Sequence, residues 1–415
     1  MAELLRIALV MGRADGHSRG VLRGARMYSL GRPWICCQAD PSDVEISRLS
    51  AWSPDGVICD AGNAHYAPGL PGGHDAAAAS HGSGDGETAL AQRLSAALGV
   101  PVVDVTLGCG RWAQARICCD CGAAGELAAQ HFLERGFHHF AFAGCSNSAC
   151  SGQCLQGFAR VVRGMDYALA STCDIATGGE LWALCRCAEH DRRLSAWLAA
   201  LPRPVGVMTC SDVVGIMAAE AARAASLRVP EDVAIVGFGD DELLCELASP
   251  PLSSVKIPSE RMGYEAAALL ERLLAGNPAP AAPVTLPPIG VVARASSDLM
   301  PFADPVLAAA VRFIRQHAHE GIGVTDVLRQ VSVSRRSLER RFRDTLHRSP
   351  LDEIKRARIQ RARELLGGTD LSLPAVARGA GFANAQWFSV VFRKETGLAP
   401  MMYRRQFRIV RPGCD

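Results

Sequence analysis

Basic residues recur near the C-terminus with a spacing that suits DNA binding. A short helix predicted at residues 325–331 is followed by a turn and a second helix, which together form a helix-turn-helix unit. In the second helix Leu338, Phe342 and Leu346 recur every four residues and predict one buried stripe. Arginines on the outward face can bond phosphates and guanine edges, although a merely solvated charged face is the alternative. The predicted DNA-contacting set is Ser334, Arg335, Arg336, Glu339 and Arg340, with Ser334 also capping the helix.

A second helix-turn-helix unit follows a long helix predicted at residues 350–366. Gly381 and Phe382 are expected to form its turn, and Phe388 with Phe392 makes the buried stripe of a helix from about residue 384 to 396. For Trp387, local packing on the surface is as good an interpretation as DNA contact. The residues predicted to remain available to DNA are Asn384, Ala385, Gln386, Trp387, Ser389 and Arg393.

The distribution of charge supports a nucleic-acid partner for the C-terminal part alone. The whole chain of 415 residues carries a net charge of +2. Residues 1–304 hold 23 Lys and Arg against 32 Asp and Glu, a balance of −9, and the remaining residues hold 21 against 10, a balance of +11. A basic module of this kind is typical of a DNA-binding domain.

Carboxylates follow several predicted strands in the N-terminal part. Apolar runs predict strands at residues 5–10, 56–59, 100–105, 140–143, 205–209 and 233–238. They alternate with helical stretches such as residues 21–28, 123–134 and 213–225, which predicts parallel sheets flanked by helices and arranged as two lobes. Ligands of such folds bind at the carboxyl ends of the strands, where these carboxylates can accept hydrogen bonds from hydroxyl groups. Helix capping is the alternative role, above all for Asp212. The candidates are Asp60, Asp104, Asp212, Asp240 and Asp241.

Changes in composition mark the domain boundaries. Prolines at residues 275–290 end the α/β part, and helical periodicity resumes after Pro305. We expect a sensing and dimerisation domain at residues 1–297, a linker at 298–304 and an all-helical DNA-binding domain at 305–411. Residues 61–87 are rich in Gly, Ala, Ser and His, so His65, His74 and His81 are interpreted as solvated side chains rather than metal ligands.

Metal, cofactor and membrane sites are not predicted. The 16 cysteines lack zinc-finger spacing and are interpreted as reduced, buried thiols. The chain start lacks the features of a signal peptide and no apolar run is long enough to span a bilayer, so we expect a cytoplasmic protein. Catalysis is disfavoured because GxSxG, P-loop, GxGxxG and HExxH motifs are absent. Cys210 beside Ser211 and Asp212 is the one alternative nucleophile, but no histidine lies near it in the sequence.

Several of these segments resemble known regulators. The segments SRRSLERRF and AGFANAQWFSVVFRKETGLAP resemble the AraC family over about residues 306–408. Residues 205–276 resemble the sugar-responsive domain of LacI/GalR regulators, which is similar to periplasmic sugar-binding proteins. This order of domains, with Arg19, Gly20 and Gly24 near the start, resembles the XylR-like group of AraC-family regulators.

The resemblance implies a DNA-binding regulator whose clamp binds a sugar. It implies an activator that contacts RNA polymerase, a homodimer formed through the N-terminal lobes, and a double-stranded DNA operator. It also adds Arg19 to the ligand-binding candidates. Relatives commonly carry Arg where this chain has Cys154 and Asp where it has Gly239, so Gln153 or Asp240 would have to substitute. The alternative is a ligand-independent regulator whose sensor-like domain serves only dimerisation.

Overall fold

The computed structural model describes residues 4–12, 15–60, 85–108, 115–146, 148–175, 188–298, 304–346 and 348–407. The chain divides into two compact units, one of residues 1–132 and 138–299 and the other of residues 133–137 and 300–415. Several predicted features lie outside the described residues. They are most of the predicted linker at 298–304, the last four residues of the predicted DNA-binding domain at 408–411, and the side chains of His65, His74 and His81. Among the described helices, none combines the length and apolar character that crossing a membrane requires.

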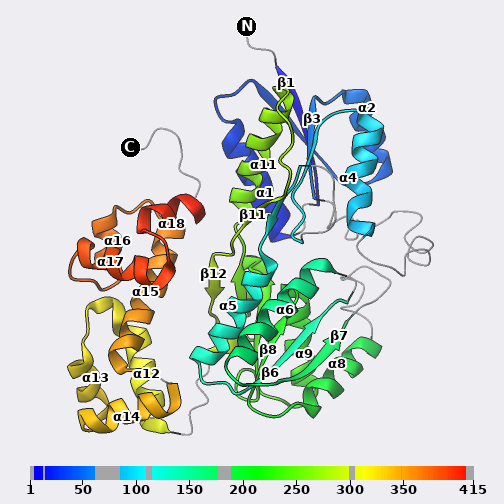
Figure 1. The fold of residues 1–415 in the computed structure, drawn as a ribbon. Coiled ribbons are helices and arrows are strands. Elements are labelled where there is room, and N and C mark those ends of the chain that lie inside the picture. The colour runs from blue at the N-terminus through cyan, green and yellow to red at the C-terminus, as the bar shows by residue number, and fades with distance from the viewer. Residues whose placement is uncertain are drawn as a thin grey trace. The chain divides into compact units, whose positions relative to one another are not determined.

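The N-terminal lobe of the first unit is a parallel sheet with helices on its faces (Figure 1). Its strand order is β2-β1-β3-β4, formed by Leu5–Val10 (β1), Trp34–Ala39 (β2), Gly56–Cys59 (β3) and Val102–Asp104 (β4). The helices are Gly16–Ser29 (α1), Asp43–Trp52 (α2), Asp85–Leu98 (α4) and Ser259–Leu274 (α11). Helices α1 and α11 touch closely because Gly24 has no side chain, since a Cβ there would lie 1.7 Å from the Glu260 carbonyl oxygen.

The C-terminal lobe has a larger sheet, ordered β12-β10-β9-β8-β6-β7, in which only β12 is antiparallel to its neighbour. The strands are His139–Gly144 (β6), Leu169–Asp174 (β7), Val205–Thr209 (β8), Val233–Gly239 (β9), Ser253–Lys256 (β10) and Gly290–Val292 (β12). Its helices are Cys121–Glu134 (α5), Ala149–Gly164 (α6), Ala188–Ala200 (α8), Asp212–Ala224 (α9) and Glu242–Leu247 (α10). One core cluster joins Val205 and Val207 of β8 to Leu198 of α8 and Met217 of α9.

Three connections cross between these lobes. Two of them carry the short parallel strands Ile117–Cys119 (β5) and Val284–Leu286 (β11), which pair with each other. The third runs from β10 directly into α11. A pair of lobes joined by a few short strands is the arrangement that permits hinge closure around a ligand.

The second unit has helices and turns but no strands in its described residues 304–346 and 348–407. Its α-helices are Pro305–His317 (α12), Val324–Val331 (α13), Arg335–Leu346 (α14), Pro350–Gly368 (α15), Leu373–Gly379 (α16), Ala385–Thr396 (α17) and Pro400–Phe407 (α18). In the hydrophobic core of the first helix-turn-helix unit, Leu338 and Phe342 of α14 pack against α12 and α13. On the long helix α15, Arg358 donates to the carbonyl oxygens of Ala318 and Ile322 at 3.0 and 2.7 Å.

The predicted fold class is confirmed: parallel α/β lobes precede an all-helical region. Strands β1, β3 and β8 have the expected bounds, and helices are present where α1, α5, α9, α14 and α17 were expected. The prediction omitted β2, β5, β7, β10 and β11. All five have half-buried or exposed positions or only three or four residues, so they lack the long continuous apolar run of a central strand. Strand β11 also lies within the proline-rich stretch that was expected only to end the α/β part.

Candidate functional site

The first helix-turn-helix unit exposes a basic helix face. Helix α13 ends at Val331, and the next residue, Ser332, has a φ of 51° and begins the turn toward α14. Ser334 is exposed and caps α14, because its hydroxyl accepts a hydrogen bond of 3.2 Å from the Ser337 amide. Arg335, Arg336 and Arg340 are exposed, while the half-buried Glu339 accepts a bond of 2.9 Å from Arg335. The predicted set therefore lies together on one face of α14.

The second helix-turn-helix unit presents a different surface. Its turn requires Gly381, which has a φ of 82° and no room for a Cβ, since the Ala318 carbonyl oxygen would lie 2.2 Å away. Asn384 caps α17 by accepting a bond of 2.7 Å from the Trp387 amide. Gln386, Trp387 and Arg393 are exposed, while Ala385 and Ser389 are half-buried and bonded to each other at 2.8 Å.

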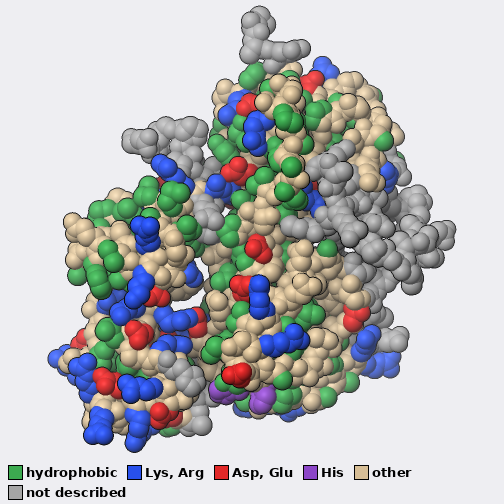
Figure 2. Space-filling view, viewed as in Figure 1, with side chains coloured by type: hydrophobic (Ala, Val, Ile, Leu, Met, Phe, Trp, Pro, Cys, Tyr) green, Lys and Arg blue, Asp and Glu red, His purple; other side chains and the backbone are tan. Residues whose placement is uncertain are grey.

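The two units differ in the chemistry of their exposed residues. Figure 2 shows Lys and Arg side chains gathered over α12–α14, whereas hydrophobic side chains gather over α16–α18. Trp387 of the predicted set is 54% exposed, and Val390 and Met402, which that set does not contain, are 61% and 54% exposed. Thymine methyl groups and sugar edges suit such a surface better than phosphates do.

An ion pair joins the two lobes of the first unit. Arg19 of α1 donates to both carboxylate oxygens of Asp241, which follows β9 in the other lobe, at 2.8 and 3.0 Å. Asp241 is 7% exposed and also lies against Gly16, where a Cβ would be 2.9 Å from its carboxyl carbon. Both residues were predicted ligand contacts, and the structure brings them together across the lobes.

Asp60 lies at the end of β3 beside His17, a residue that the sequence prediction missed. The Asp60 carboxylate is 3.8 Å from His17 Nε2, and the His17 ring also contacts Ser259 Oγ at 2.9 Å and the Val105 carbonyl oxygen at 3.1 Å. Burial lowers the pKa of His17 and so favours its neutral form. The only sequence signal for His17 was its position two residues before Arg19.

Asp104 is the last residue of β4, which is next to β3 in the sheet, and its carboxylate is paired within the protein. Its carboxylate lies 2.7 Å from the Arg116 guanidinium, with both side chains 1% exposed, and it accepts a bond of 2.6 Å from the Thr106 hydroxyl. Arg116 was not predicted, because it lies twelve residues away in a segment without helical or strand periodicity. The buried pair orients Asp104 and satisfies much of its hydrogen-bonding capacity.

Asp212 orients the loop after β9 rather than capping its own helix. Ser211 is the N-cap of α9 and accepts from the Val214 amide at 3.3 Å, so the capping alternative for Asp212 is wrong. The Asp212 carboxylate accepts bonds from the Ser254 hydroxyl at 2.5 Å and from the Asp241 amide at 2.8 Å. Burial raises the pKa of Asp212 to about 6.

Asp240 directly follows β9 and is held by two cations. It lies 2.8 Å from Arg294 and 3.4 Å from Lys256, and its own side chain is 2% exposed. The preceding Gly239 has a φ of 125°, which an aspartate rarely adopts, and a Cβ there would lie 3.1 Å from the Asp212 carboxylate. The absence of an aspartate at residue 239 therefore agrees with the local backbone.

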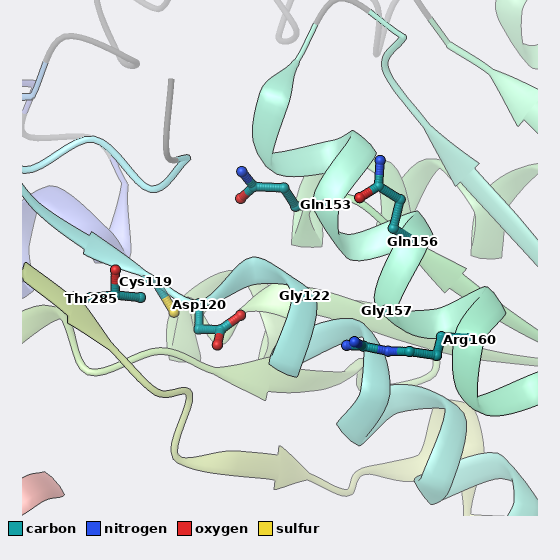
Figure 3. Close-up of a pocket in the computed structure, with 8 residues that line it drawn as sticks. All are labelled: Cys119, Asp120, Gly122, Gln153, Gln156, Gly157, Arg160 and Thr285. Atoms are coloured by element: carbon teal, nitrogen blue, oxygen red, sulfur yellow. The ribbon is translucent and has the colours of Figure 1, made fainter. Parts of the chain in front are cut away.

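Gln153 lies apart from these carboxylates. It lines a pocket of about 370 Å³ formed by α5, α6, β5 and β11, together with Asp120, Gln156, Arg160 and Thr285 (Figure 3). In Figure 3 its amide points toward the open space of this pocket. The structure thus does not bring Gln153 together with Asp212 or Asp240 through any described contact.

Comparisons with known proteins agree with both units. Residues 129–297 match a periplasmic binding protein-like domain, and residues 327–406 match a helix-turn-helix domain. The xylose operon regulatory protein of Haemophilus influenzae is 30% identical over 282 residues, covering 67% of this chain and 72% of that protein. The xylose operon regulatory protein of Escherichia coli strain K12 is 28% identical over 410 residues, or 96% of each chain.

Solved structures give the same picture. A structure of the xylose-binding transcription activator xylR has a TM-score of 0.56 and 27% identity, covering 98% of this chain and 100% of that one. A complex of the transcriptional regulator CelR with cellobiose has a TM-score of 0.52 over 70% of this chain and 84% of that one, and at 24% identity it shows a shared fold.

A two-lobed sensor domain of the sugar-binding type followed by a double helix-turn-helix domain defines a DNA-binding transcription regulator rather than an enzyme. The chain belongs to the AraC-family group of xylose-operon-regulator-like proteins.

Proposed function

We propose that this regulator activates transcription when a sugar-like small molecule binds between the lobes of its sensor domain. Residues 1–297 would bind the ligand and form a homodimer, and residues 305–411 would bind a double-stranded operator and present the protein to RNA polymerase. The names of the relatives make xylose the first sugar to test. The ligand would transmit its signal by binding one arrangement of the lobes more tightly than the other.

The operator would be read by both helix-turn-helix units. Arg335, Arg336 and Arg340 on α14 supply cations for phosphates and guanine edges. Gln386 and Trp387 on α17 supply an amide and an apolar surface, with Arg393 as the cation. Because the two faces differ chemically, we expect an asymmetric binding site for each subunit.

The ion pair between Arg19 and Asp241 is the single observation that carries the sensing proposal. It joins the two lobes through one partly exposed cation, since the Arg19 side chain is 34% exposed. Hydroxyl groups of a ligand can accept from Arg19 and donate to Asp241, and Asp60, which lies beside His17 on the N-terminal lobe, offers a further acceptor. Asp104, Asp212 and Asp240 would act through orientation, because they are bonded to Arg116, Ser254 and Arg294 respectively.

Thermal unfolding across a sugar panel tests this proposal. The panel contains pentoses including xylose, hexoses, their phosphates and uronic acids, and a ligand that binds only the folded protein raises its Tm. We expect one class to stabilise the wild type, the Asp241→Asn variant to lose that shift, and Glu220→Gln, an exposed carboxylate on α9, to retain it.

The same experiment separates the alternative function. If no sugar raises the Tm while the protein still binds DNA, the sensor-like domain serves only dimerisation. The protein partners of Asp104, Asp212 and Asp240 are the observation that favours this alternative, because those carboxylates have charged or hydrogen-bonding partners within the protein.

A further inference from the structure

Three cysteines that are distant in sequence gather in the C-terminal lobe. The Sγ atoms of Cys121, Cys150 and Cys154 all lie within 4.8 Å of one another. The Cys121 and Cys150 sulfurs are 2.9 Å apart. Cys121 and Cys154 are fully buried and Cys150 is 9% exposed. Their spacing along the chain matches no zinc-finger pattern, so the sequence alone did not predict this thiol triad.

Close packing of two helices holds the triad in place. Cys121 is the first residue of α5, and Cys150 and Cys154 lie one turn apart on α6. The two backbones meet at glycines: a Cβ on Gly125 would lie 2.0 Å from the Cys154 carbonyl oxygen, and one on Gly157 would lie 1.9 Å from the Gly122 carbonyl oxygen. The sulfurs therefore converge in the folded lobe without any added ligand.

The surroundings of the triad favour negative charge on sulfur. Helices α5 and α6 both begin here, and helix N-termini stabilise anions. Thiolate is the form of cysteine that binds metals, so this position suits metal binding by the three sulfurs.

We propose that Cys121, Cys150 and Cys154 form a binding site for Cu⁺, a soft, thiol-preferring metal ion. Three thiolates around one ion match the soft-ligand preference of Cu⁺, whereas structural zinc takes four protein ligands. Among the described residues no fourth His, Cys, Asp or Glu joins this group. Binding releases thiol protons to solvent and changes no oxidation state.

The site links the metal to the connecting strands of the sensor. Cys121 lies two residues after β5, which pairs with β11 where the chain passes between the lobes. An ion bound by these three sulfurs would hold the first residue of α5 against α6. This inference concerns a site separate from the Arg19 and Asp241 pair and does not depend on the sugar proposal.

Anaerobic titration of the reduced full-length protein with Cu⁺, in competition with a chromogenic Cu⁺ chelator, tests the site. We expect the variant with Cys121→Ala, Cys150→Ala and Cys154→Ala to bind one equivalent fewer than the wild type. The matched control is Cys145→Ala with Cys210→Ala, whose sulfurs are 3.9 Å apart, and it should retain the wild-type number of equivalents. Equal binding by the triple variant, or loss in the control instead, would overturn the proposal.

Alkylation mapped by mass spectrometry tests the wild type directly and does not require the triple variant to fold. One equivalent of Cu⁺ should protect the three triad thiols ahead of Cys145 and Cys210. Protection of other cysteines first would contradict the site. A disulfide between Cys121 and Cys150 in protein purified without an added oxidant would replace the metal site with a redox pair.

Discussion

The sensor and the DNA-binding domain treat charge in opposite ways. In the sensor, the side chains of Asp104 and Arg116 are each 1% exposed and lie 2.7 Å apart, so they form an ion pair inside the protein. In the DNA-binding domain, Arg336 and Arg340 are exposed on α14. Buried charges must be paired to be tolerated, whereas exposed cations remain available to an external anion. Charged side chains in the sensor therefore hold one another in place inside the protein, whereas those on α14 are free to bind DNA.

Replacing exposed arginines should have the largest effect, and it should fall on DNA binding alone. The double variant Arg336→Ala with Arg340→Ala removes two contacts worth about 1–3 kcal/mol each, so affinity for the operator should fall at least about 30-fold. The salt dependence of binding should also weaken, because fewer phosphates are neutralised. Fluorescence anisotropy over a range of salt concentrations measures both quantities.

Arg361→Ala provides the control for that experiment. Arg361 pairs with Glu364 on α15 and belongs to neither recognition helix, so its replacement should leave operator affinity nearly unchanged. If the double variant and this control bind DNA equally well, α14 is not the recognition helix.

Breaking the buried pair should affect stability rather than DNA contact. Arg116→Met leaves Asp104 buried without its cation and should cost about 3–5 kcal/mol of the free energy of unfolding of the sensor. Arg160→Met removes an ion pair with Glu126 in which Arg160 is 69% exposed, and it should cost less than about 1 kcal/mol. Urea unfolding compares the two, and equal costs would contradict the distinction between buried and exposed charge.

The stability of the sensor should also depend on pH through Asp212. Burial raises its pKa to about 6 in the folded protein, from an ordinary value of 3.8. The folded state therefore holds this proton more tightly than the unfolded state, and the resulting stability is full below about pH 4 and lost as the pH rises through 6. This contribution is up to about 3 kcal/mol.

Asp212→Asn isolates that dependence. As the pH falls from 7 toward 4, the wild type should gain stability relative to the variant in urea unfolding measured at each pH. A constant difference between the two proteins over this range would show that Asp212 does not titrate there.

The smallest effect is expected at Asn384, where two substitutions distinguish a helix cap from a DNA contact. Its side chain accepts from the Trp387 amide, and Asn384→Ala should cost about 1 kcal/mol of stability. Asn384→Ser keeps the cap and should restore stability. If operator affinity is restored as well, Asn384 acts as a cap; if affinity stays low in the stable serine variant, Asn384 contacts DNA.

The sequence predicted the DNA-binding domain better than the sensor site, for a physical reason. In a helical unit, period 3.6 decides which residues are buried, so Leu338, Phe342 and Phe388 and their exposed neighbours were assigned from local spacing. The partners of the sensor carboxylates come from distant segments, as with Asp240 and Arg294 or Asp212 and Ser254. No local pattern encodes those contacts, and the same holds for the thiol triad.

The most direct test of ligand control is the affinity of the full-length protein for its operator with and without the stabilising sugar. Selection from random double-stranded DNA supplies the operator, and the Asp241→Asn variant serves as the comparison. We predict that the sugar changes the operator affinity of the wild type, while the variant binds DNA normally and does not respond. Equal affinity of the wild type with and without a sugar that raises its Tm would contradict ligand control.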